Sequence, residues 1–74
     1  RDKTRITILH RNIPNMIGQF TALLAKDNVN IDDMTNKSRG SYAYTMIDVD
    51  NDVAEDVVKG LEMIEGVLKV RVIA

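Results

Sequence analysis

The spacing of apolar residues along this chain switches repeatedly between that of a strand and that of a helix. Ile6 and Ile8 alternate with more polar neighbours, whereas Ile17, Phe20 and Leu24 recur at the spacing of one helix face. The same two patterns return in the second half of the chain. Strands are predicted over residues 4–10, 29–37, 42–50 and 67–74, and helices over residues 16–26 and between residues 52 and 66. The chain therefore consists of two strand–helix–strand halves in the order βαββαβ.

This order predicts an α+β, ferredoxin-like fold, in which a four-stranded antiparallel sheet carries two helices on one face. The first and third strands are expected to be central. Residues 29–37 alternate poorly and are rich in Asp, Asn and Thr, a composition that suits an edge strand. Residues 1–74 are expected to form a single domain with a thin core, because so short a chain buries only about 60% of its unfolded surface. A partner would therefore add much stability.

Residues suited to turns and helix ends separate these elements. Asn15 stands before the first helix, either as an N-cap or as a left-handed turn residue. Asp52 and Glu55 have the spacing of a capping box at the start of the second helix. Gly40 marks a turn between two strands, and Gly66 marks the end of the second helix.

The sheet face without helices is predicted to be mixed in character. Alternation assigns to it Arg5, Thr7, Tyr42, Tyr44, Met46, Lys69 and Arg71. We interpret this face as an ordinary solvated surface. RNA-recognition modules share this order of elements, but they carry aromatic residues on both central strands, and here the first strand has none.

The composition argues against several classes of function. The chain has no cysteine and one histidine, so we expect no catalytic residue, no metal and no cofactor in this domain. Its net charge is −1, and we expect neither nucleic acid nor a membrane as a partner. No apolar run approaches the roughly 20 residues of a membrane-spanning helix. The lack of cysteine fits a reducing compartment, and we expect a cytoplasmic protein.

Short motifs stand on both sides of the first helix. The first strand runs into "HRNIPN", and "DNVNI" follows the helix. With this order of elements, the chain resembles an ACT domain, and more narrowly the C-terminal ACT domain of phosphoglycerate dehydrogenases. The matching positions are His10, Asn12, Pro14, Val29, Asn30 and Ile31. Where the family has glycine, this chain has Asn15 and Asn28. Asparagine is the best substitute for glycine at positive φ, so we expect both turns to survive.

The resemblance implies a regulatory domain without catalytic activity of its own. Domains of this family pair edge to edge and bind an amino acid at the seam, which in these dehydrogenases is L-serine. The implied parent is an NAD-dependent phosphoglycerate dehydrogenase, which would hold the NAD and of which this chain would be a C-terminal fragment. The missing initiator methionine fits a fragment, although removal of a tag explains it as simply. The implied effector contacts are His10, Asn12, Pro14, Asn15, Asn30 and Ile31, with Asp32 and Asp33 as ammonium contacts.

An alternative keeps the fold and changes the function. Asn15 puts a side chain where the family brings backbone close to the ligand, so the chain would be an ACT-type dimerisation module whose effector site is altered or lost. Without the resemblance, His10 is a surface residue and Asn12 and Asn15 are ordinary turn residues. Asp32 and Asp33 then only protect the edge of the sheet.

Overall fold

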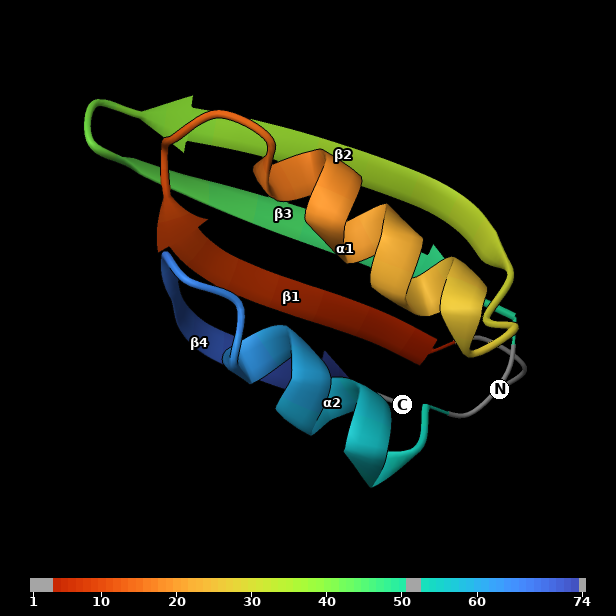
Figure 1. Ribbon diagram of the computed structural model, residues 1–74. Coiled ribbons are helices and arrows are strands. Elements are labelled where there is room, and N and C mark those ends of the chain that lie inside the picture. Colours follow the sequence, from red (N-terminus) through yellow and green to blue (C-terminus); the bar gives the residue numbers. More distant parts are fainter. Residues whose placement is uncertain (1–3, 51–52, 74) are drawn as a thin grey trace.

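The computed structural model describes residues 4–50 and 53–73, and its elements follow the predicted order (Figure 1). The strands are β1 (Thr4–Arg11), β2 (Ile31–Arg39), β3 (Tyr42–Val49) and β4 (Val67–Ile73), and the helices are α1 (Met16–Lys26) and α2 (Glu55–Glu62). All strand pairs are antiparallel, in the sheet order β2-β3-β1-β4. Both helices lie on the same face of the sheet (Figure 1). The predicted fold is confirmed, with β1 and β3 central and β2 and β4 at the edges.

The core lies between the helices and one face of the sheet. Ile6 and Ile8 of β1 point into it, and Phe20 and Leu24 of α1 cover them; all four are fully buried. The other fully buried apolar residues are Ile47, Val49 and Leu61. The helical stripe predicted in α1 is therefore confirmed for Phe20 and Leu24, whereas Ile17 packs at the margin of the core and is only half-buried.

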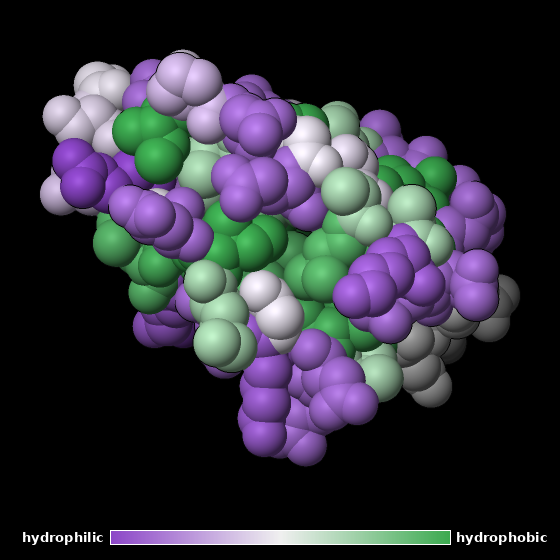
Figure 2. All heavy atoms as spheres, in the orientation of Figure 1, coloured by the Kyte–Doolittle hydropathy of each residue, from purple (hydrophilic) through white to green (hydrophobic). Residues whose placement is uncertain are grey.

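The two helices approach each other closely at one point. A Cβ added to Gly60 of α2 would lie 3.1 Å from the Cδ2 atom of Leu23 in α1, so glycine allows this contact. Apolar side chains show between the helices, with hydrophilic side chains around them (Figure 2). A shallow hollow of about 320 Å³ lies there, lined by Leu23, Gly60 and Ile64 among others. No helix among the described residues is long and apolar enough to span a membrane.

The start of β2 comes two residues later than predicted. Asn28 adopts a positive φ of 59°, and the backbone N–H of Val29 donates to the carbonyl of Leu24 at 2.9 Å. These features close the end of α1, and Val29 is buried with the core rather than paired in the sheet. The strand begins at Ile31 as a result.

Alternation predicts Leu68, Val70 and Val72 on one face of the fourth strand and Lys69, Arg71 and Ile73 on the other, and this prediction is wrong for Leu68 alone. Regular alternation would turn Leu68 toward the helices together with Val70, but β4 has a bulge opposite Leu9 and His10. Val67 pairs with His10 and Lys69 pairs with Leu9, so Leu68 is the extra residue that a bulge leaves without a partner. Its side chain is 52% exposed as a consequence.

The start of α2 also differs from the prediction. The N-cap position is Ala54, which has no capping side chain, and Glu55 is the first helical residue. The placement of Glu55 as the third residue of a capping box is therefore wrong, and Asp52 lies outside the described residues. Two acidic residues in the first turn, Glu55 and Asp56, stabilise this end through the helix dipole instead.

Candidate functional site

The loop between β1 and α1 is held against two neighbouring turns. The backbone N–H of Arg11 donates to the carbonyl of Gly66 at 2.8 Å. The backbone N–H of Asn12 donates to the carbonyl of Ser41 at 2.8 Å, and its side-chain Nδ2 donates to the carbonyl of Gly40 at 3.1 Å. Gly40 has a φ of 59°, as a two-residue hairpin turn requires at its first position. An exposed loop is thus fixed in place at the β2–β3 turn.

The entry into α1 leaves the end of the helix open to an anion. Asn15 is the N-cap residue with φ at 67°, and its side chain makes no capping hydrogen bond. The first turn contains no acidic residue, so the unpaired N–H groups and the partial positive charge of the helix end are not neutralised locally. Gln19 binds the Asn15 carbonyl twice, through its backbone N–H at 3.3 Å and its Nε2 at 3.2 Å. The expectation that asparagine preserves the glycine-type turns is confirmed for Asn15 and Asn28.

His10 does not lie on the surface. Its side chain is 2% exposed, and its ring meets the ring of Phe20 edge-on with centroids 5.0 Å apart. Nδ1 lies 2.9 Å from the carbonyl oxygen of Arg11, which only accepts, so Nδ1 is the donor of that bond. Nε2 lies 2.8 Å from the hydroxyl of Thr45. The side chain has no free surface for a ligand, and it holds the end of β1 against α1 and β3.

The residues at the start of β2 lie at the opposite end of the sheet from this loop (Figure 1). Asn30 donates from Nδ2 to Oδ2 of Asp50 at 2.9 Å, and its carbonyl accepts from the Asp50 backbone N–H at 3.3 Å. Ile31 is half-buried against the core, whereas Asp32 and Asp33 are exposed. Oδ1 of Asp33 accepts from the backbone N–H of Met34 at 2.9 Å.

One protomer therefore brings together only part of the predicted site. Asn12, Pro14 and Asn15 lie around the entry to α1, with the buried His10 behind them. The other predicted residues, Asn30, Ile31, Asp32 and Asp33, lie near the far end of the edge strand. Among the described residues, no cluster of acidic and histidine side chains has the arrangement of a metal site.

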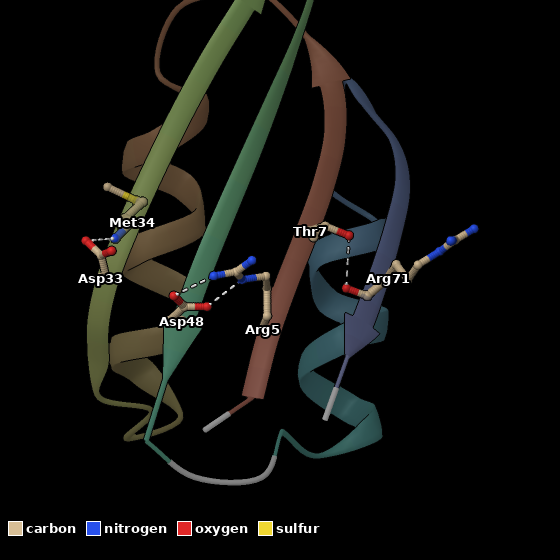
Figure 3. Close-up of polar contacts among 6 residues, drawn as sticks. All are labelled: Arg5, Thr7, Asp33, Met34, Asp48 and Arg71. Carbon is tan, nitrogen blue, oxygen red and sulfur yellow. Dashed lines mark hydrogen bonds and ion pairs between the residues drawn. The ribbon is translucent and has the colours of Figure 1, made fainter. Parts of the chain in front are cut away.

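The helix-free face holds features that alternation alone did not reveal. Strand pairing sets Lys37 and Arg39 of β2 opposite Tyr44 and Tyr42 of β3, and neither cation was predicted on this face. At the other end, Arg5 forms an ion pair with Asp48 at 2.8 Å (Figure 3), and this hydrogen bond raises the pKa of Arg5 above its ordinary value. In a strand that alternates poorly, such as β2, only the pairing register with its neighbour shows on which face of the sheet each residue lies.

Comparison with known proteins identifies the fold. No protein-family model matches the chain, and no curated protein matches it. Among solved structures, the ACT domain from GTP pyrophosphokinase of Chlorobium tepidum superposes with a TM-score of 0.80 at 16% identity, over 96% of each chain. The chain has the fold of an ACT domain. The ACT domain protein from Streptococcus pneumoniae gives a TM-score of 0.73 at 20% identity, over 95% of this chain and 85% of the other.

The ACT fold also matches part of a larger regulatory protein. The regulatory subunit of aspartate kinase from Thermus thermophilus gives a TM-score of 0.77 at 18% identity, and this chain covers 50% of its length. Identities this low establish the fold and nothing finer. The L-serine effector and the phosphoglycerate dehydrogenase parent stay predictions.

Proposed function

We propose that this chain is a non-catalytic, cytoplasmic regulatory domain that binds an amino acid at a seam between two copies of itself. In its specific form, the effector is L-serine and the parent is an NAD-dependent phosphoglycerate dehydrogenase that holds the NAD in its own catalytic part. The proposal rests on one observation: the two halves of the predicted site, the entry to α1 and the start of β2, lie near opposite ends of the edge strand β2. Solved structures with the same fold include a regulatory subunit of aspartate kinase.

Pairing of two edge strands would unite these halves. β2 has nine residues, so its ends are about 30 Å apart. If two copies pair β2 with β2 in antiparallel fashion about a two-fold axis, the start of one strand lies beside the end of the other. The partner's Asn30 then approaches the β2–β3 turn that fixes Asn12. A ligand bound there stabilises the pairing itself, and a domain without catalytic groups can control an enzyme in this way.

The groups at such a seam suit a free amino acid. The carboxylate would accept hydrogen bonds from the open end of α1, whose first turn has no acidic residue. The amides of Asn12 and the partner's Asn30 both donate and accept, which suits a ligand with two opposite charges. The ammonium would lie near the partner's Asp32 and Asp33. The role assigned to His10 is to position the end of β1, because its ring is buried and both ring nitrogens are bonded.

The alternative of a dimerisation module without an effector also has an observation in its favour. The Asn15 side chain stands over the first turn of α1, since its Oδ1 lies 2.7 Å from the place of a Cβ on Gly18. A ligand must share this space with the amide. Titration calorimetry with L-serine, and then with the other common amino acids, separates the two functions. We expect heat with one binding site per protomer, and no heat with any amino acid would favour the dimerisation module.

Asn30→Ala is expected to weaken L-serine binding by about 10- to 150-fold, because the variant loses a hydrogen bond to a charged ligand. Asp50→Ala is the matched control, since it breaks the same bond within the protomer at 2.9 Å but keeps the amide. We expect Asp50→Ala to change the affinity by less than about threefold, an effect within about 0.7 kcal/mol. Calorimetry measures both affinities. Unchanged affinity in Asn30→Ala, or equal losses in the two variants, would remove Asn30 from the site.

A further inference from the structure

The helix-free face of the sheet carries a cationic half with two tyrosines, which we call the basic tyrosine face. It comprises Tyr42 and Tyr44 of β3 with Lys37, Arg39, Lys69 and Arg71 of the two edge strands. Leu9 of β1 pairs with both Tyr44 and Lys69 in the centre. The side chain of Arg71 extends away from the sheet into solvent (Figure 3). The two tyrosines are 51% and 40% exposed, so their rings are open to a ligand.

Two hollows adjoin on this face. One of about 220 Å³ has Lys69 and Arg71 in its wall, and the other of about 290 Å³ has Lys37 and Arg39. Leu9 and Tyr44 line both hollows. Each hollow thus combines a tyrosine wall with a pair of cations from one edge strand.

Charge is strongly segregated on this face. Within residues 4–50 and 53–73, none of the four cations of the basic tyrosine face forms an ion pair. The acids that pairing places on the same face, Asp33 and Asp48, lie at its other end, where Asp48 binds Arg5. Arg11 adds a fifth cation beside Tyr42. A net charge of −1 for the whole chain therefore conceals a cationic surface.

Charge and shape together select the occupant. A second copy laid face to face would set cations against cations, which costs free energy. An anionic lipid surface would pair with the cations, but lipid headgroups would not fill two separate hollows beside tyrosine rings. Single-stranded nucleic acid supplies both parts, because bases stack on aromatic rings while phosphates meet Lys and Arg. Tyr42 and Tyr44 stand two residues apart on one strand, about 6.8 Å, so each ring has room for its own base.

We propose that the basic tyrosine face binds a short stretch of single-stranded nucleic acid, with bases on Tyr42 and Tyr44 and phosphates along the four cations. The face lies on the opposite side of the sheet from the helices and shares no residue with the proposed effector site. The inference therefore does not rest on the amino-acid effector. It differs from the expectation, drawn from net charge and from the lack of aromatic residues on the first strand, that nucleic acid is no partner.

Fluorescence anisotropy with labelled eight-nucleotide oligouridylate and oligothymidylate tests the proposal. We expect binding at 50 mM salt that weakens toward 200 mM. Release of counterions from four phosphate contacts predicts a slope of about −2.8 in a plot of log affinity against log salt concentration. No binding at 50 mM salt would overturn the proposal.

Variants separate stacking from simple charge attraction. Tyr44→Leu, or Tyr42→Leu if the first variant does not fold, is expected to weaken binding by about 5- to 150-fold. The double variant Lys69→Gln/Arg71→Gln should make the salt slope shallower by about 1.4. Lys26→Gln/Lys59→Gln is the matched control, because it removes two exposed cations from the helices. This double variant should change neither the affinity for the oligonucleotide nor the salt slope.

Two comparison ligands complete the test. Duplex RNA and vesicles that contain phosphatidylserine should bind more weakly than the single strand at the same salt, and their binding should not depend on Tyr44. Equal affinity for all three ligands, with no effect of the tyrosine variants, would overturn the proposal in favour of a general anion-binding surface. Equal losses of affinity in Lys26→Gln/Lys59→Gln and in Lys69→Gln/Arg71→Gln would overturn the proposal as well.

Discussion

Phe20→Ala is expected to lower the free energy of unfolding by about 3–5 kcal/mol, as large aromatic truncations in a core do. The Phe20 side chain is fully buried between α1 and the sheet, and it also meets the ring of His10. A domain of this length has a total stability of about 4–11 kcal/mol. The loss would therefore remove a large part of the stability, and the urea midpoint measured by circular dichroism should fall steeply.

Phe20→Leu is the control for this expectation. Leucine keeps most of the apolar volume, so the free energy of unfolding should fall by less than about 1.5 kcal/mol. Similar small losses in both variants would contradict the central place of Phe20 in the core. In that case, the end of β1 would be held mainly by the bonds of His10 to Arg11 and Thr45.

The architecture was predictable because every element has a local pattern that agrees with the whole. Ile6 and Ile8 alternate, Phe20 and Leu24 repeat at helical spacing, and both sets are fully buried. Asn15 and Asn28 adopt positive φ, as their chemistry suggested. The polar composition of β2 matched its place at the edge of the sheet. Local and tertiary preferences coincide in these places, so sequence patterns suffice.

The differences arise where contacts distant in sequence decide the outcome. His10 is buried because Phe20 and Thr45 close over it, and a single polar residue at a strand end does not reveal that. Leu68 leaves its expected face because the register with β1 shifts, which depends on the pairing of two strands more than 50 residues apart. The cations of β2 were not placed on a face because a poorly alternating strand has no face until its partner strand sets the register.

Met34→Asp is expected to convert a dimer of this chain into a monomer, with a dissociation constant raised by about 100-fold or more. Met34 lies on edge strand β2 opposite Ile47, and it is 38% exposed. Its side chain extends outward from β2, on the side away from β3 (Figure 3). Pairing of β2 with β2 would bury it from both copies at once, so each dimer would carry two buried carboxylates. Sedimentation velocity over a range of protein concentrations measures the shift.

Met63→Asp provides the matched control, because Met63 is 85% exposed beside α2, away from the edge strand β2. This variant should keep the dimer while making the same chemical change. If the wild-type chain is monomeric at high concentration, or if both variants weaken association equally, pairing through β2 is wrong. The two halves of the proposed effector site would then stay about 30 Å apart, and no single amino acid spans that distance. Loss of the dimer and loss of L-serine binding should therefore occur together in Met34→Asp, whereas the basic tyrosine face should bind oligouridylate in the monomer as before.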